Sequence, residues 1–142
     1  MKEMNQNEIK EFLTRGTYTA KLGTINKDGS PHITPIWFIL DENDYIVFTT
    51  YSDSLKAKNL VRDPRVSICV DDQTPPFSFV RVIGIAKIMS DSKDLLLWTT
   101  KIAERYMGKE LSLDYGKRNA VEGELIIKVI PNKINGQKDI SK

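Results

Sequence analysis

The chain has 142 residues, of which 40% are hydrophobic, with 21 basic residues, 19 acidic residues and one cysteine, and this is ordinary for one globular domain over residues 1–142. The balanced charge argues against a nucleic-acid-binding surface, and the lone cysteine excludes an internal disulfide. Because no apolar stretch could span a bilayer and the N-terminus lacks the apolar segment of a signal peptide, we expect a cytoplasmic protein without membrane contact.

A short helix and three strands are predicted for the first half of the chain. Asn5 or Asn7 is suited to cap the helix, in which Phe12 and Leu13 belong to an apolar face with helical spacing. The strands alternate with turns rich in Asp, Asn and Gly, so they are expected to form a meander. The strands are predicted at 18–25, 32–40 and 46–50, with turns at 26–30 and 41–45.

A second helix and two more strands follow in the middle of the chain. Ser52 or Asp53 can cap a helix of barely two turns. Asp63-Pro64 ends it, because the residue before a proline disfavours the helical conformation. Gly84 is expected to form a β-bulge in the second strand. The strands are predicted at 65–70 and 77–89, separated by a proline-rich loop at 71–76.

The last third of the chain is predicted to hold one more helix and one more strand. Asp91 and Asp94 favour a helix start, and the helix is expected to end near Gly108. Six strands with three helices between them predict a mainly antiparallel sheet that curls into a barrel. The lysine-rich tail has few apolar residues and is expected to be frayed. The predicted boundaries are a last strand at 124–130, a domain core of about 8–130 and a tail of 131–142.

The chain is poor in side chains that catalyse reactions by themselves. His32 and Cys69 lie on predicted strands without a CxxC or HExxH motif, so neither a metal site nor a Cys–His dyad is expected. We interpret His32 as a strand-edge residue near solvent and Cys69 as a buried apolar residue. The acidic pairs at 41–42 and 71–72 fall in predicted turns and are interpreted as solvated. No catalytic residue can be assigned, so we expect redox chemistry, if present, to come from a bound cofactor.

The segment FTTYSDSLKAKN at 48–59 combines hydroxyl groups with lysines where a strand passes into a helix. Unpaired backbone N–H groups at a helix start and nearby ammonium groups suit an anion, most often a phosphate. Thr50 and Ser54 would supply hydroxyls, and Lys56 and Lys58 positive charge. The same residue types are also common as helix caps and exposed lysines, so both interpretations stay open. Neither GxGxxG nor GxxxxGK occurs, so Rossmann and P-loop phosphate sites are not expected.

Four segments occur in order along the chain: DGSPHITPIWF at 28–38, IVFTT at 46–50, SLKAKNLVRDPRVSICV at 54–70 and VRVIGIAKI at 80–88. Together they resemble the pyridoxamine 5′-phosphate oxidase-like proteins, a group that includes flavin- and deazaflavin-dependent oxidoreductases. The resemblance covers roughly residues 8 to 130. It implies an antiparallel six-stranded split β-barrel of the FMN-binding type. It also implies a homodimer with two cofactor sites at the subunit interface.

The resemblance assigns cofactor-binding positions as well. It places the flavin ring along the second and third strands and the cofactor phosphate at the start of the second helix. The strand beside the ring matches Thr34, Pro35, Ile36 and Trp37, the end of the next strand matches Thr49 and Thr50, and the phosphate positions match Ser54, Lys56 and Lys58. Lys56 is the first candidate for the phosphate. FMN is the expected cofactor, and coenzyme F420 is the alternative.

Two departures from the oxidases themselves argue against vitamin B6 oxidation. Leu55 stands where an Arg-Lys pair commonly follows the serine, so one charge is missing from the phosphate site. The C-terminal PNKINGQKDISK lacks the Arg and His that hold the substrate phosphate in those enzymes. The loop DDQTPPFSFVRV and the segment IAERYMG are more similar to small split-barrel reductases. We expect a flavin- or deazaflavin-dependent oxidoreductase for a small organic substrate, and a non-catalytic flavin or tetrapyrrole carrier or sensor remains the alternative.

Overall fold

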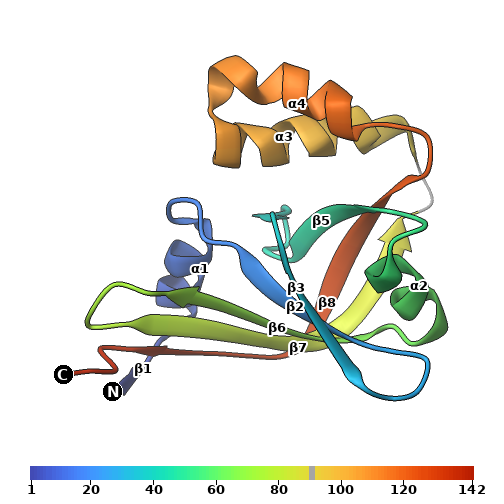
Figure 1. Ribbon diagram of the computed structural model, residues 1–142. Coiled ribbons are helices and arrows are strands. Elements are labelled where there is room, and N and C mark those ends of the chain that lie inside the picture. Colours follow the sequence, from blue (N-terminus) through green and yellow to red (C-terminus); the bar gives the residue numbers. More distant parts are fainter. Residues whose placement is uncertain (90–91) are drawn as a thin grey trace.

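A computed structural model describes residues 1–89 and 92–142 of the chain (Figure 1). The strands are β1 Lys2–Glu3, β2 Ala20–Ile25, β3 Pro31–Ile36, β4 Ile39–Leu40, β5 Ile46–Tyr51, β6 Arg65–Asp72, β7 Ser78–Met89 and β8 Glu124–Lys138. The helices are α1 Gln6–Thr14, α2 Leu55–Arg62, α3 Leu95–Met107 and α4 Ser112–Asn119, with 3₁₀ turns at Ser92–Asp94 and Lys109–Leu111. No helix within the described ranges is both long and apolar enough to cross a membrane.

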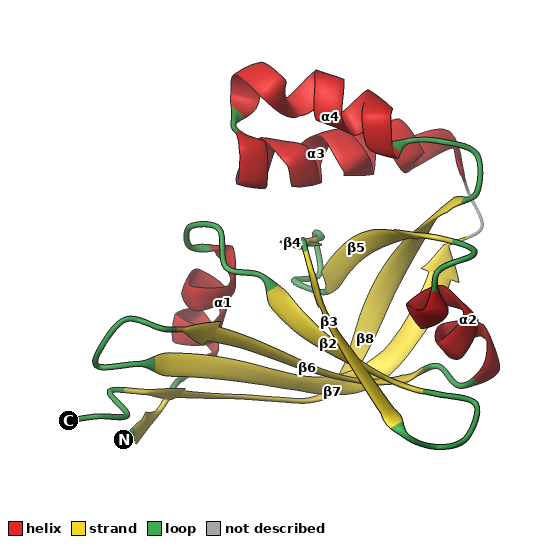
Figure 2. Cartoon of the chain, viewed as in Figure 1, coloured by secondary structure: helices red, strands yellow, loops and turns green. Residues whose placement is uncertain are grey.

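The strands form one curled antiparallel sheet in the order β3-β2-β6-β7-β8-β5-β4, and β1 pairs with β8. Figure 2 shows α1 and α2 on opposite sides of the curled sheet, with α3 and α4 lying together above it. Alternate residues of the long strands are buried, as in Val66, Ile68 and Val70 of β6, so one face of the sheet encloses the core. The predicted mainly β, split-barrel type of fold is confirmed, although the sheet of the described residues has eight strands where six were predicted.

The strand predicted at 32–40 is divided into β3 and β4. The backbone of Phe38 leaves the ladder because two side chains of α3 bind it instead. The N–H of Phe38 donates to the hydroxyl of Tyr106 at 3.1 Å, and its carbonyl accepts from Arg105 at 2.9 Å. A contact from a distant helix therefore interrupts a sequence that is strand-like throughout.

Gly84 lies at an irregularity in the pairing of β7 with β8, which confirms the predicted bulge. A Cβ at this position would lie 2.4 Å from the carbonyl oxygen of Ile130 in β8. Such an approach is far inside van der Waals contact, so only glycine lets the two backbones pass here.

The prediction of a frayed tail after residue 130 is wrong. β8 continues to Lys138, paired with β7 as far as Gln137 opposite Phe79, and Lys138 also lies opposite Lys2 of β1. The tail has few apolar side chains because the backbone ladders on its two sides, rather than side-chain burial, hold it in place. The domain core therefore extends beyond the predicted boundary.

The helix predictions succeed in part. Asn5 caps α1 in a reciprocal capping box with Glu8, as predicted. The cap of α2 is Ser54 rather than Ser52 or Asp53, and Asp63 ends the helix as expected. α3 ends at Gly108, which has a φ of 90°, whereas the expected contribution of Asp91 lies outside the described residues.

The helix α4 was not predicted, because its sequence SLDYGKRN is polar and contains a glycine. The glycine has a packing role. A Cβ at Gly116 would lie 2.2 Å from the hydroxyl oxygen of Thr100, and the carbonyl of Gly116 accepts a 2.8 Å hydrogen bond from Thr99. α4 is thus defined by its close fit against α3 rather than by an apolar pattern.

The interpretation of the acidic pairs as solvated turn residues is right for Glu42, and it is wrong for Asp41, Asp71 and Asp72. The side chain of Asp41 is fully buried, and its Oδ2 lies 2.7 Å from Nζ of Lys128. Its Oδ1 accepts hydrogen bonds from two backbone N–H groups within the turn, each at 2.9 Å. β6 extends to Asp72, and Asp71 forms a 2.8 Å ion pair with Lys21.

Candidate functional site

A cavity of about 330 Å³ lies between the α3–α4 pair and the strands β3, β5 and β8. We call it the Lys56 pocket. Six of the nine predicted cofactor-binding residues line it: Pro35, Ile36, Trp37, Thr49, Thr50 and Lys56. The prediction did not include the other lining residues, which are Thr99, Ile102, Asn119 and Glu124.

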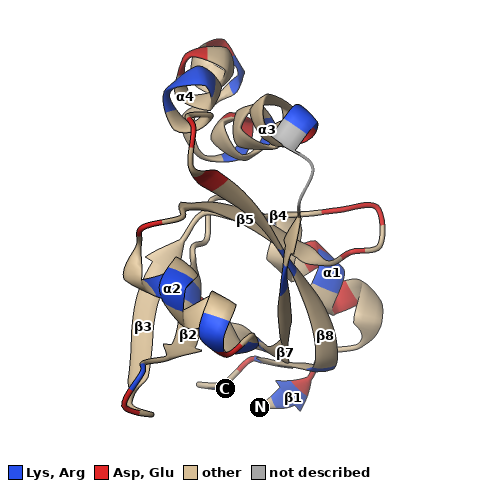
Figure 3. Cartoon of the chain, turned by 90° about the vertical axis from the view of Figure 1, so that its right-hand side faces the viewer, with Lys and Arg blue, Asp and Glu red and all other residues tan. Residues whose placement is uncertain are grey.

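The topology explains why these segments meet. β5 pairs with β8, so Tyr51 lies directly opposite Glu124 and Thr49 opposite Ile126, and residues opposite each other share a face of the sheet. α2 begins soon after β5, which places Lys56 in its first turn beside the end of that strand. Figure 3 shows basic positions on α2 and acidic positions where the chain enters β8.

The lysine of the pocket is not neutralised by an ion pair. Among residues 1–89 and 92–142, no carboxylate lies within 4 Å of the ammonium group of Lys56. The side chain is half-buried, so its charge is only partly screened by water. An anionic group entering the pocket would find this cation available.

The hydroxyl groups beside Lys56 are arranged by the start of α2. Ser54 Oγ accepts a 3.2 Å hydrogen bond from the N–H of Ala57 and lies 2.9 Å from Thr50 Oγ1. Within the described chain, the N–H groups of Leu55 and Lys56 have no hydrogen-bond acceptor. Ser54 therefore shapes the helix start, while two N–H groups remain for an anion.

Three of the predicted residues do not line the pocket. Lys58 pairs with Asp53 at 3.1 Å and lines a separate cavity beside the turn at 26–30. Thr34 lies opposite Leu22 in the ladder, and Leu22 belongs to the core, so Thr34 faces the interior of the barrel. Ser54 acts on the pocket only through Thr50 and the helix start.

Trp37 forms one wall of the pocket, and Tyr106 is stacked on it. The rings of Trp37 and Tyr106 are stacked with centroids 4.9 Å apart and an angle of 4° between their planes. The Tyr106 hydroxyl donates to the carbonyl of Tyr18 at 2.7 Å and accepts from the N–H of Phe38. Burial raises the pKa of Tyr106, so the phenol stays neutral and the wall is fixed by hydrogen bonds.

Arg105 fastens α3 to the barrel. Its guanidinium donates to the carbonyls of Leu13, Gly16 and Phe38 at 2.8, 3.0 and 2.9 Å. Its charge also lies 4.6 Å from the ring centre of Phe38. Because α3 carries two of the lining residues, these bonds hold one side of the pocket.

We expect Arg105→Ala to loosen α3 and α4 locally, by about 1.5 kcal/mol for the loss of hydrogen bonds from a charged donor that water partly replaces. Hydrogen–deuterium exchange should show faster exchange over residues 95–119 and unchanged exchange in β6 and β7. Arg118→Ala, at an exposed position of α4, is the matched control. Equal protection of α3 in wild type and Arg105→Ala would show that packing alone holds the helix.

Glu124 is a functional candidate that the sequence did not reveal. Burial raises the pKa of its carboxyl group, and interactions with Thr49 and Lys56 offset part of that rise. The one local signal is an acidic residue at the head of the apolar run ELIIKVI. Nothing in the sequence placed this carboxyl in the same pocket as Lys56.

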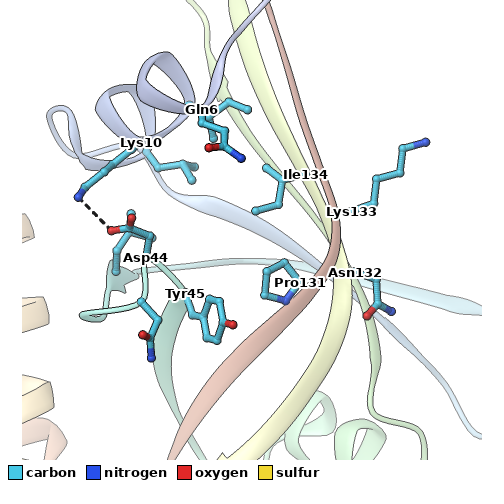
Figure 4. Close-up of a pocket in the computed structure, with 12 residues that line it drawn as sticks. Gln6, Lys10, Asp44, Tyr45, Pro131, Asn132, Lys133 and Ile134 are labelled. Carbon is cyan, nitrogen blue, oxygen red and sulfur yellow. Dashed lines mark ion pairs between the residues drawn. The ribbon is translucent and has the colours of Figure 1, made fainter.

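A second cavity, of about 460 Å³, lies between α1, the turn at 41–45 and β8 (Figure 4). Lys10 forms a 3.2 Å ion pair with Asp44 at this cavity, and the side chain of Lys133 extends away from it. The cations around it are therefore either paired or directed outward, which makes it a poorer anion site than the Lys56 pocket.

The remaining chemical candidates lie outside both cavities. His32 is on the edge strand β3, as predicted, although its Nδ1 is buried and has no hydrogen-bond partner in the described part of the chain. Cys69 is only partly buried, which corrects the prediction of a core residue, and burial raises the pKa of its thiol. Among the described residues, no group of three His, Cys, Asp or Glu side chains could hold a metal ion.

Comparisons with known proteins give one matching family model and several solved structures of the same fold. The family described as pyridoxamine 5′-phosphate oxidase matches residues 6–138. The conserved hypothetical protein Rv2991 from Mycobacterium tuberculosis is 27% identical, with a TM-score of 0.83 over 97% of this chain and 87% of its own. A structure described as F420 reductase is 24% identical, with a TM-score of 0.68 over 87% and 94%. The haem storage protein HutZ from Vibrio cholerae is 18% identical, with a TM-score of 0.70 over 91% and 92%. No curated protein matches.

Proposed function

The chain belongs to the pyridoxamine 5′-phosphate oxidase-like family of split-barrel proteins, and from this premise we propose that it is a flavin- or deazaflavin-dependent oxidoreductase acting on a small organic substrate. The observation that carries the proposal is the unpaired cation of Lys56 in a pocket with hydroxyl groups on one side and a stacked aromatic pair on the other. The polar end suits a phosphate, and the aromatic wall suits a planar ring.

The donor set fits a cofactor with a single phosphate. Lys56, the free N–H groups at the start of α2 and the hydroxyl of Thr49 would hold that phosphate. When bound, the flavin supplies the hydride or electron transfer. The chain's own residues bind and orient it, and Trp37, backed by Tyr106, together with Ile102 excludes water from one side of the pocket.

FMN is favoured over coenzyme F420 by the surrounding charges. The acidic tail of F420 would need further cations beyond Lys56, and Lys58, Arg62 and Arg81 are the basic residues considered for it. Lys58 is paired with Asp53, and Arg62 is bound to the carbonyl of Ile25. Arg81 lies opposite Cys69 on the other part of the sheet. None of the three lines the Lys56 pocket.

The proposal includes a homodimer. Gly23 lies opposite both Ile33 and Ser67, and Ser67 opposite Ile83, so these residues share the outer face of the sheet. Ile33 is 69% exposed and Ile83 is 43% exposed, and a shallow cavity of about 430 Å³ crosses the same face. A second copy of the chain would cover this apolar surface.

We expect Ile33→Glu to give a monomer, because it replaces apolar contact surface with a carboxylate that would lose its hydration against the partner copy. Light scattering after size-exclusion chromatography measures the mass directly. Lys27→Glu, at an exposed position in the turn before β3, is the control and should leave the dimer intact. A wild-type protein that is monomeric at micromolar concentration would contradict the dimer proposal.

A second candidate is a non-catalytic flavin carrier or sensor in the same fold. It is supported by the pocket itself, where no histidine or cysteine is among the lining residues of the described chain. His32, a potential ligand for a tetrapyrrole iron, lies outside the pocket, so a flavin is the better cargo. A cytoplasmic location is part of both proposals.

The visible absorption spectrum of the purified protein, followed by titration with FMN, tests flavin binding. We expect FMN to bind with its fluorescence changed and riboflavin, which lacks the phosphate, to bind more weakly. Absence of binding by FMN and F420 alike would overturn the proposal. Anaerobic reduction of the bound flavin then separates enzyme from carrier, because an enzyme accelerates reoxidation by its acceptor relative to free FMN.

A further inference from the structure

The Lys56 pocket contains a carboxyl group as well as a cation. Glu124 stands at the first position of β8 and lines the pocket together with Lys56 and Thr49. A site built only for a phosphate would be expected to carry donors and cations, since phosphate oxygens are acceptors. The carboxyl group therefore needs an explanation.

The charged groups around Glu124 are few. Lys56 of α2 is the cation that acts on it, and Tyr51 of β5 lies directly opposite in the ladder. α3 and α4 face the pocket with Thr99, Ile102 and Asn119, which carry no charge. With the α3–α4 side uncharged, the balance between Lys56 and Glu124 decides the electrostatics of the pocket.

An ionised Glu124 and a phosphate dianion would repel each other strongly in this partly dehydrated pocket, because like charges at close range cost several kcal/mol. A protonated Glu124 removes this repulsion, and its O–H can donate a hydrogen bond to a phosphate oxygen. Burial already raises the pKa of the carboxyl group in the free protein. A bound anion raises that pKa further, by the same electrostatic rule.

We propose that Glu124 is a ligand-facing group of the Lys56 pocket, which takes a proton from solvent when an anionic phosphate binds and donates it in a hydrogen bond to that phosphate. The inference rests on the proposed function, because it requires the phosphate of the cofactor to lie beside Lys56. It makes the pocket selective for a phosphate ester that binds together with one proton, and binding therefore weakens as the pH rises.

The sign of the linkage follows from the proton uptake. Below the pKa of Glu124 in the free protein the proton is already present, and FMN affinity does not depend on this group. Between this pKa and the higher pKa of the complex, binding takes up one proton, so affinity falls by up to about tenfold per pH unit. The Glu124→Gln variant cannot take up this proton, so its FMN affinity should lack this part of the pH dependence.

Isothermal titration of FMN into the wild-type protein and into Glu124→Gln, in buffers of different ionisation enthalpy, measures the protons taken up. Because the phosphate ester titrates near neutral pH itself, the difference between the two proteins is the relevant quantity. The titrations are repeated from pH 6 to pH 8.5 or so. Glu122→Gln, an exposed carboxyl two residues earlier, is the matched control.

Support consists of a larger proton uptake in the wild type and in Glu122→Gln than in Glu124→Gln, with Glu124→Gln binding FMN several-fold more tightly at the high end of the pH range. Equal proton uptake in all three proteins, or weaker binding by Glu124→Gln at every pH, would overturn the inference and leave the proposed function standing. Failure of the wild type and both variants to bind FMN and, in a parallel titration, F420 would overturn the proposed function, and the inference with it.

Discussion

Replacing Lys56 by alanine should weaken FMN binding by about 1.5–3 kcal/mol, the range for a hydrogen bond to a charged group. This corresponds to roughly a tenfold to hundredfold rise in Kd. The effect is large because, within the described ranges, Lys56 is the one cation that lines the pocket and no carboxylate pairs with it. Fluorescence titration with FMN measures the change, and thermal unfolding should show the barrel intact.

The neighbouring lysine provides a stringent control for this result. Lys58 lies in the same helix, but it pairs with Asp53 and lines the separate cavity beside the turn at 26–30. Lys58→Ala should change the Kd of FMN by less than about twofold, as expected for an exposed charge. If the two variants bind FMN equally well, the phosphate does not lie beside Lys56, and the assignment of the pocket is wrong.

Replacing Asp41 by asparagine should lower the free energy of unfolding by about 3 kcal/mol at neutral pH. This is the low end of the range for breaking a buried ion pair, since Lys128 keeps 18% of its side chain exposed. The variant leaves the Lys128 ammonium without its counter-charge. Urea unfolding at pH 7 measures the difference, and the exposed neighbour Glu42 replaced by Gln should be nearly neutral.

The Asp41–Lys128 ion pair also makes the free energy of unfolding depend on pH. Burial tends to raise the pKa of Asp41, but Lys128 and the N–H groups of Tyr45 and Asn43 outweigh it, so the folded-state pKa lies below the ordinary value of 3.8. Because the folded pKa is lower than the unfolded one, the stabilisation is complete above about pH 3.8 and is lost as the pH falls through the folded value. The difference in the free energy of unfolding between wild type and Asp41→Asn should therefore become smaller at acid pH. A gap that stays constant down to pH 2 or so would show that the carboxylate charge contributes nothing.

The phosphate segment shows how far local reasoning reaches. Hydroxyls and lysines at a strand-to-helix transition point to an anion site, and the structure opens a pocket there. The structure also places the two lysines at different cavities. Residues two positions apart on a helix point roughly 200° apart, so Lys56 and Lys58 cannot both face one pocket. Helical geometry excludes one of the two lysines from the pocket, and the tertiary structure shows that Lys56 is the one that lines it.

The sequence by itself determined the features that depend on neighbouring residues along the chain. Asn5 as a cap, the stop at Asp63 and the bulge at Gly84 follow from local backbone chemistry, and the alternation of buried residues in β6 follows from the two-residue period of a strand. These features, together with the ordered segments of the family, were enough for the fold class.

The tertiary structure alone decided which distant residues meet. Arg105 and Tyr106 take the backbone of Phe38 out of its ladder, and the pairing of β5 with β8 places Glu124 in the pocket of Lys56. The partners in each case are far apart in the chain, and no local propensity encodes their distance. The order of strands in the sheet decides which side chains share a pocket. Backbone pairing brings two strands side by side, but the sequence between them carries no signal that they will pair.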